Sequence, residues 1–177
     1  MIEEQDIWLA QKGDKAAFTR LIKEHQHSMY RVAKGILKND ADCADAIQEA
    51  IIKSYLAIHQ LRDSQVFKAW ITRIVINQCY DLLKKQRKII LMEAVEIEEK
   101  MDVPKDYYEL SEAMDQLNKE HRIVVTLFYY EQFSVEEIAE ILDVKEGTVK
   151  SRLNRARQKL AELLQLDDGK RGEHHGL

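Results

Sequence analysis

The sequence contains little glycine and almost no proline, with 6 Gly and 1 Pro in 177 residues. Average usage of about 7% and 5% would give roughly 12 and 9. Because these residues mark hairpins and turns, their scarcity argues against an all-β fold and indicates long helices. The two cysteines, Cys43 and Cys79, lie in apolar helical patterns. We interpret them as buried residues in a reducing compartment rather than as a disulfide or metal pair.

Long apolar runs are also missing. The longest covers residues 123–130 with Thr126 included, far short of a membrane span. The first residues are acidic, which predicts no signal peptide, and we therefore expect a cytoplasmic protein. We find no nucleophile paired with a base, no phosphate-binding glycine loop and no histidines at metal-ligand spacing. The sequence thus predicts no catalytic residues, no cofactor, no metal site and no small-molecule substrate.

The formal net charge of −4 argues, as a crude rule, against a nucleic-acid-binding protein. The charge is unevenly distributed, however, with net values of +4, −7, 0 and −1 over residues 1–90, 91–115, 116–166 and 167–177. The average therefore conceals a mildly basic first half. An acidic middle segment, which contains the only proline (Pro104), separates it from the second half.

Apolar residues recur at the three- and four-residue spacing of helices in both halves. They predict helices over residues 18–36, 47–61 and 67–82, with a short one near 4–12. We expect an all-α protein of two small helical domains, residues 1–90 and 111–166, joined by a flexible acidic linker at 91–110 and followed by a polar tail at 167–177.

Residues 123–130 are the one ambiguous stretch. They are rich in β-branched and aromatic residues, which favour a strand by propensity. Leu117, Val124, Leu127 and Phe128 nevertheless keep helical spacing, and no turn signal closely flanks the run. We therefore predict a buried helix.

The C-terminal half carries the pattern of a helix-turn-helix. Ser134 and Glu137 form a capping box before a short helix. A break at 142–147 precedes a long helix with apolar residues on one face. The other face carries no carboxylate between Gly147 and Leu160, and its candidate DNA contacts are Thr148, Lys150, Ser151, Arg152, Asn154, Arg155 and Arg157.

These residue types suit DNA. Arg and Asn bond base edges in the major groove, while Lys, Ser and Thr bind phosphates. A solvated helix face would normally mix charges of both signs. Here the sequence resembles region 4 of extracytoplasmic-function (ECF) sigma factors, through the segments 137–139, 147–153 and 155–157. Other helix-turn-helix regulators share such segments, so the first half decides the identification.

The first half resembles region 2 of the same family. The segment that binds the clamp helices of RNA polymerase in this family matches Asp45, Gln48 and Glu49. The family's promoter-melting segment matches residues 67–71 and 74–77, followed by Asp81. To hold one strand of melted DNA, a protein needs polar or apolar pockets for the bases beside cations for the phosphates. The candidate −10 contacts are Ser64, Gln65, Phe67, Asn77, Lys84, Lys85, Arg87 and Lys88.

Each of these candidates has a plainer interpretation. Trp70 lies on the apolar stripe and fits a core residue better than a stacking platform, and Phe67 is equally consistent with either role. The run 84–88 suits a solvated helix end, where cations also favour the helix dipole. Ile51, Asn118 and Lys145 depart from the family pattern, which often has Phe, Pro and Ser there.

The resemblance implies a sigma factor that binds core RNA polymerase, recognises the −10 and −35 elements of promoter DNA and responds to an envelope or stress signal. It also implies an anti-sigma partner, often membrane-anchored. In the family, the linker threads the cationic nucleic-acid channel of the polymerase. Two other hypotheses are a stand-alone helix-turn-helix regulator and a helical protein-interaction module.

Overall fold

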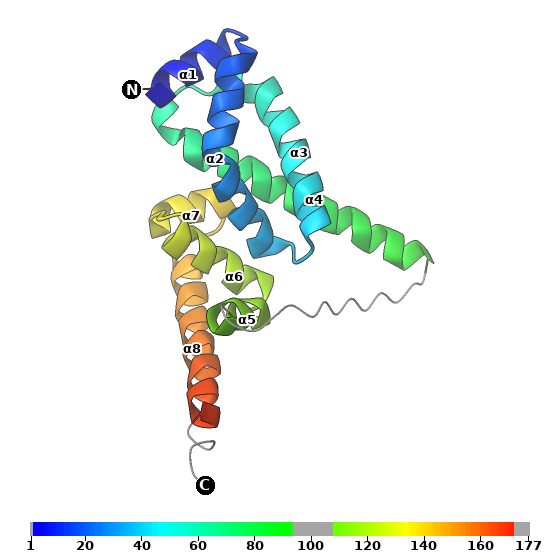
Figure 1. The fold of residues 1–177 in the computed structure, drawn as a ribbon, viewed down its shortest axis with the longest axis vertical. Helices are drawn as coiled ribbons and strands as arrows, with labels where there is room; N and C mark the ends of the chain where they lie inside the picture. The colour runs from blue at the N-terminus through cyan, green and yellow to red at the C-terminus, as the bar shows by residue number, and fades with distance from the viewer. Residues whose placement is uncertain (1, 94–107, 172–177) are drawn as a thin grey trace.

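The computed structural model describes residues 2–93 and 108–171, and every regular element within them is helical (Figure 1). This confirms the all-α prediction. The elements are α1 (Ile2–Gln11), α2 (Lys15–Ile36), α3 (Asp40–Ala57), η1 (Ile58–Gln60), η2 (Ser64–Val66), α4 (Phe67–Glu93), α5 (Tyr108–Gln116), α6 (Lys119–Val125), η3 (Thr126–Tyr130), α7 (Val135–Leu142) and α8 (Glu146–Arg171).

Two of the expected segments fall partly outside the described residues. The proposed linker at 91–110 begins within α4 and ends within α5, and its central residues 94–107 lie outside the described part of the chain. The proposed polar tail at 167–177 begins within α8, and residues 172–177 lie outside.

Short polar side chains define where the helices begin. Asp14, Asn39, Asn118 and Ser134 accept hydrogen bonds from backbone amides at the starts of α2, α3, α6 and α7, and Asp63 does so for η2. Each cap satisfies an amide that has no partner within its own helix. The interruptions at 39–40 and 62–64 are therefore set by local hydrogen bonding.

The N-terminal half packs α1, α3 and α4 around α2. Leu21, Met29 and Val32 of α2 are almost fully buried in its core. Arg20 of α2 donates to the carboxylate of Asp6 in α1, with 3.0 Å between Nε and Oδ2. This hydrogen bond lowers the pKa of Asp6 and holds α1 against the bundle.

The C-terminal half consists of α5–α8, and the ambiguous stretch 123–130 is helical as predicted. It begins in α6 and continues through η3, which has π-helical hydrogen bonding. Ile123, Val124 and Leu127 are fully buried. Tertiary burial therefore outweighs the strand propensity of these residues.

The two halves pack directly against each other. α6 and η3 lie on α2, and α7 lies on α4, so that the buried residues of both halves form one continuous cluster (Figure 1). α1 and the C-terminal end of α8 lie at opposite ends of the molecule. This arrangement brings surfaces of α4 and α8 close together.

Candidate nucleic-acid and polymerase interfaces

The helix-turn-helix begins at the predicted capping box. The Ser134 hydroxyl accepts from the Glu137 amide over 3.1 Å, and the Glu137 carboxylate accepts from the Ser134 amide over 2.7 Å. α7 ends at Leu142, its cap residue Asp143 has a φ of 54° in the left-handed region, and α8 begins at Glu146. The tight turn fixes α8 relative to α7.

One face of α8 is buried and the other is exposed. Val149, Leu153 and Ala156 are buried, as the apolar stripe predicts. The candidate DNA contacts lie off that stripe: Lys150, Ser151, Asn154, Arg155 and Arg157 are exposed, and Thr148 and Arg152 are half-buried. The exposed side therefore presents donors and cations along several turns of one helix, as a major-groove reader requires.

The candidate cations of α8 differ in their surroundings. Lys150 pairs with Glu146 over 3.2 Å, while Arg155 makes no side-chain hydrogen bond or ion pair within the described chain. Arg157 donates from Nε to the Tyr129 hydroxyl over 2.6 Å. Arg152 lines a cavity between α8 and α4. Arg155 is therefore free to contact a ligand, whereas Arg157 is already engaged.

The candidate −10 loop is a short capped turn. Asp63 accepts from the Gln65 amide over 2.9 Å, and the Ser64 hydroxyl donates to Glu4 over 3.2 Å. Gln65 is exposed, but Phe67 is 1% exposed and its ring packs against that of His25, 5.2 Å away between centroids. The structure thus places Phe67 in the core, out of reach of a base.

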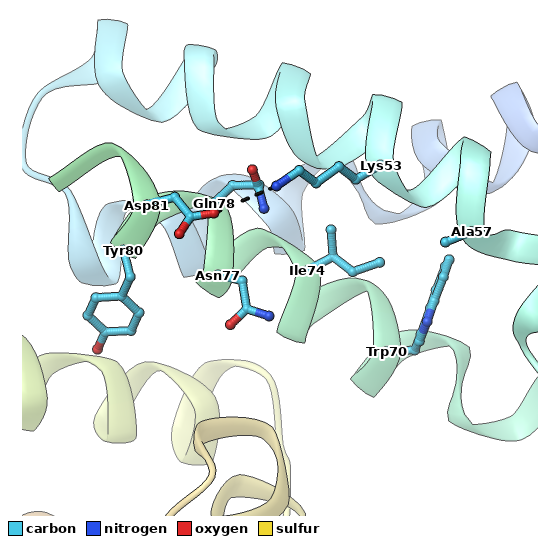
Figure 2. Close-up of a pocket in the computed structure, with 8 residues that line it drawn as sticks. All are labelled: Lys53, Ala57, Trp70, Ile74, Asn77, Gln78, Tyr80 and Asp81. Atoms are coloured by element: carbon cyan, nitrogen blue, oxygen red, sulfur yellow. Dashed lines mark ion pairs between the residues drawn. The ribbon is translucent and has the colours of Figure 1, made fainter. Parts of the chain in front are cut away.

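The middle of α4 borders a groove of about 490 Å³ between α3 and α4 (Figure 2). Asn77 is exposed in this groove, and Trp70 forms part of its wall while packing against the core. Lys53 and Asp81 pair across the groove over 3.6 Å. The groove combines an aromatic wall with polar groups, which suits a nucleobase.

The predicted basic run, residues 84–88, lies near the C-terminal end of α4, in the last turns whose side chains are described. Lys84, Lys85, Arg87 and Lys88 are all exposed, and none makes an ion pair within the described residues. Gln86, in the middle of the run, donates to Asp42 over 3.0 Å. Four unpaired cations remain for phosphates or another anionic partner.

The candidate polymerase contacts lie together on α3. Asp45, Gln48 and Glu49 are exposed on this helix. Ile52 and Leu56 follow at helical spacing and are 54% and 65% exposed. Sequence reasoning missed these two residues, although both fall off the buried stripe of α3. Large apolar side chains exposed beside polar ones are typical of a protein-binding surface.

Other kinds of site receive no support from the described residues. They contain no group of three or more His, Cys, Asp or Glu side chains placed to hold a metal ion. No helix in the described ranges is both long and apolar enough to span a bilayer. Cys43 and Cys79 are free and buried, and burial raises their thiol pKa values to about 11 and about 12.

Comparison with known families assigns both halves. Residues 21–89 match the model of sigma-70 region 2, and residues 107–160 match that of sigma-70 region 4. The RNA polymerase sigma factor SigV of Bacillus subtilis is 34% identical over 145 residues, covering 80% of this chain and 87% of SigV. The ECF sigma factor SigM of Mycobacterium tuberculosis is 30% identical over 86% of this chain and 79% of SigM.

The chain belongs to the ECF sigma factors of the sigma-70 family. It is therefore an RNA polymerase sigma factor, as the resemblance implied. We refer below to residues 21–89 as region 2 and to residues 107–160 as region 4.

Solved structures support the same fold. The sigma factor RpoE from Bartonella quintana, solved with the anti-sigma factor NepR, superposes with a TM-score of 0.75 at 25% identity, covering 85% of this chain and 98% of RpoE. CnrH, solved with the cytosolic domain of CnrY, gives a TM-score of 0.70 at 24% identity over 94% of this chain and 99% of CnrH.

Proposed function

We propose that this ECF sigma factor contacts the −35 element through the exposed face of α8. The support is the set of exposed donors Lys150, Ser151, Asn154 and Arg155 on a capped helix-turn-helix. Arg155 and Asn154 suit base edges, while Lys150 and Ser151 suit phosphates. The absence of carboxylates from Gly147 to Leu160 removes the repulsion that a mixed helix face would exert on DNA.

Region 2 then contacts the −10 element through η2 and α4. Ser64 and Gln65 lie on the capped turn before α4, and Asn77 lies in the groove three to four turns of helix further on. The groove offers a polar edge contact and an aromatic wall to an unstacked base. The exposed cations at 84–88 extend the same helix and suit the backbone phosphates of the strand.

Core RNA polymerase binds the exposed face of α3 in this proposal. Asp45, Gln48 and Glu49 supply polar contacts, and Ile52 and Leu56 supply the apolar area. In this proposal the chain directs the polymerase and leaves catalysis to it, and it works where the polymerase and chromosome are, in the cytoplasm. By analogy with the RpoE–NepR complex, an anti-sigma protein holds it inactive until a stress signal releases it.

The deciding experiment combines purified chain, core RNA polymerase and a pool of genomic fragments in run-off transcription. We expect co-elution of the chain with core enzyme and transcripts from a small set of fragments, each starting downstream of shared −10 and −35 sequences. Failure to bind core enzyme would overturn the proposal. Tight duplex binding by the chain alone, without transcripts, would favour a stand-alone regulator.

Asn77→Ala tests the role assigned to α4. We expect polymerase binding to be kept and promoter opening to be impaired, seen as reduced permanganate reactivity of thymines in the melted strand. Lys53 lines the same groove, and Lys53→Ala leaves the Asn77 amide in place, so this variant serves as the matched control. Normal permanganate reactivity in Asn77→Ala would contradict the assignment.

A further inference from the structure

A further pocket lies between α1 and the turn that precedes η2. Its volume is about 470 Å³, within the range of about 300–1,000 Å³ that is usual for ligand sites. Trp8 and Gln11 of α1 line it together with Leu61, Arg62 and Ser64 of the turn. None of its lining residues belongs to region 4, and α1 lies at the end of the molecule remote from the C-terminal end of α8 (Figure 1). The pocket is therefore open in the free chain.

The floor of the pocket is apolar and held in place. Ile7 and Leu61 line it and are 3% and 8% exposed. Gln11 Nε2 donates to the Leu61 carbonyl over 2.7 Å and to the Ile58 carbonyl over 3.2 Å. These hydrogen bonds join α1 to the chain on either side of the end of η1. The two walls of the pocket therefore keep a fixed spacing.

Trp8 presents an aromatic surface at the edge of this pocket. It is 58% exposed, although its neighbour Ile7 is buried. Lys12 follows one helical turn later, and its Nζ lies 5.9 Å from the centre of the indole ring. An indole that lines a pocket and remains more than half exposed offers a flat face on which another ring can stack.

Cations lie beside the indole ring. Arg62 lines the pocket, is exposed and makes no ion pair within the described ranges. Lys12 is also exposed. The carboxylate among the lining residues is that of Glu4, which accepts from the Ser64 hydroxyl over 3.2 Å. Two cations thus remain near the ring for an anionic ligand.

An aromatic face with adjacent cations suits a nucleotide of single-stranded DNA. Proteins bind single strands by stacking bases on aromatic rings and placing cations at the backbone phosphates. In a duplex the faces of each base are covered by its neighbours, so only an unstacked base can lie on Trp8. The chemistry of the pocket therefore selects melted DNA over the duplex.

The pocket is continuous with the proposed −10 surface. Ser64 belongs to both, because it lies on the η2 turn and also lines the pocket. Ala57 and Trp70, at the two ends of the same segment of chain, line the groove that contains Asn77. Residues 57–70 thus border two aromatic sites. A strand that crosses η2 can place one base in each.

We propose that the pocket between α1 and the η2 turn binds a second unstacked base of the melted −10 strand, stacked on Trp8, with Arg62 and Lys12 at the adjoining phosphates. This inference rests on the proposed contact of η2 and α4 with the −10 element. Because stacking tolerates any base, the pocket stabilises the open strand and leaves sequence recognition to the Asn77 groove.

Substitutions of Trp8 test the stacking contact in the holoenzyme formed by the full chain and core RNA polymerase. The ligand is a fluorescent single-stranded oligonucleotide with the −10 sequence of a promoter found in the run-off experiment above. We expect Trp8→Ala to weaken binding about fivefold or more, the lower end of the range for base stacking. Trp8→Phe keeps a flat ring and should bind within about twofold of wild type. Trp8→Leu keeps apolar volume without the ring and should lose as much as Trp8→Ala.

Tyr30→Ala is the matched control for the loss of an exposed aromatic ring. Tyr30 is 43% exposed on α2, and its hydroxyl donates to Asp40 at the start of α3 over 2.9 Å. It does not line the pocket at α1. We expect this variant to bind the oligonucleotide as wild type does. A loss equal to that of Trp8→Ala would overturn the inference, because the effect would then not depend on the pocket.

A scan with abasic sites identifies the bound base. Each oligonucleotide of the series lacks one base of the −10 region. At one position, we expect the missing base to cost wild type about fivefold in affinity or more and to cost Trp8→Ala less than about twofold. The other positions should weaken both holoenzymes equally. If no position shows a loss that depends on Trp8, the stacking contact is wrong.

Salt dependence separates the phosphate contact from the stacking contact. Arg62→Gln keeps hydrogen-bonding capacity and removes the charge. We expect the slope of the logarithm of affinity against the logarithm of salt concentration to fall by about 0.7, the value for one phosphate contact to a single strand. Trp8→Ala should leave the slope unchanged. An unchanged slope in Arg62→Gln would contradict the phosphate contact of Arg62.

The two proposals fail in distinguishable ways. If the wild-type holoenzyme binds the −10 oligonucleotide no better than a shuffled sequence, the proposed −10 function fails. If it binds the −10 sequence tightly and Trp8→Ala binds it equally well, only the pocket assignment fails. Weaker binding of Trp8→Ala to core enzyme, with full core binding by Trp8→Leu, would show that the polymerase covers this pocket and would also overturn the inference.

Discussion

Arg157 of α8 and Tyr129 of η3 form a paired contact on the surface of region 4. The Arg157 Nε donates to the Tyr129 hydroxyl over 2.6 Å, and the guanidinium carbon lies 5.6 Å from the centre of the tyrosine ring. The Phe128 ring lies at 5.7 Å on the same guanidinium. Arg157 therefore links the recognition helix to the preceding helix, although its sequence position suggests a DNA contact.

We expect Arg157→Ala to lower the free energy of unfolding by about 0.5–1 kcal/mol, the usual value of an exposed cation–π contact. Tyr129→Phe keeps the ring and removes the hydroxyl, so it should lose only the hydrogen-bonded part of that contribution. Urea unfolding followed by circular dichroism measures both. If Arg157→Ala keeps the wild-type free energy of unfolding but loses as much DNA binding as Arg155→Ala, then Arg157 contacts DNA instead.

Arg155→Ala should weaken selection of the −35 sequence by about 1–3 kcal/mol, the cost of losing a bidentate contact to a base pair. The measurement compares run-off transcription from templates with intact and altered −35 sequences. Lys159→Ala removes the same charge from an exposed position further along α8 and is the control. An unchanged preference in Arg155→Ala would remove this residue from the recognition surface.

Ile52→Asp and Leu56→Asp should each weaken binding to core polymerase at least tenfold, because they place a charge at the centre of the proposed α3 interface. Since both side chains are exposed, the free energy of unfolding should change by no more than about 0.5 kcal/mol. Competition with a labelled sigma factor for core enzyme gives the affinities. Trp8→Asp, at a 58% exposed site on α1, tests whether any exposed apolar residue has this effect.

The packing of region 4 against region 2 should be insensitive to pH between 8 and 6. It is held in part by the buried Glu131 carboxylate, which accepts from Ser28 and Arg31 of α2 and lies 3.6 Å from Lys68 Nζ of α4. The pKa of Glu131 is lowered in the contact, so its contribution is complete above its ordinary value of about 4.3 and is lost as pH falls through the lowered value. X-ray scattering measures separation of the two regions as an increase in the radius of gyration, and circular dichroism checks that the helix content stays constant. Glu131→Gln has no carboxyl group to protonate at this position, so it should abolish the acid-dependent increase. Opening between pH 8 and 6 would contradict the assignment.

The helices were predictable because their signals are local. Apolar spacing locates α2, α3 and α4, and the Ser134 capping box locates the start of α7. The helical spacing of Val124 and Leu127 also identified α6 correctly against its strand propensity. The π-helical hydrogen bonding of η3 has no comparable signal, because a segment of 5 residues is too short to show a separate apolar period.

The contact between the two regions was not predictable in the same way. In the sequence, nothing near Arg31 or Lys68 distinguishes them from cations on a solvated helix face. Glu131 lies between Tyr130 and Gln132 at the end of a helix, with no other charged residue next to it. Their pairing spans about 60 to 100 residues of sequence, so no local periodicity reports it. Phe67 could not be assigned for a related reason, because its burial depends on His25 from a different helix.

Under the proposed −10 contacts, α4 would serve both promoter recognition and the packing of region 4. Arg73, Asn77 and Tyr80 of α4 line a cavity of about 320 Å³ against the end of α7 and Arg152 of α8. On the proposed contacts, a substitution there that suits a different −10 sequence would also alter the fit of region 4. Promoter choice and the packing of the two regions would then be inherited together. A chimera that joins this region 2 to the region 4 of a relative should accordingly be less stable than either parent, unless the residues on both sides of that cavity are exchanged as a set.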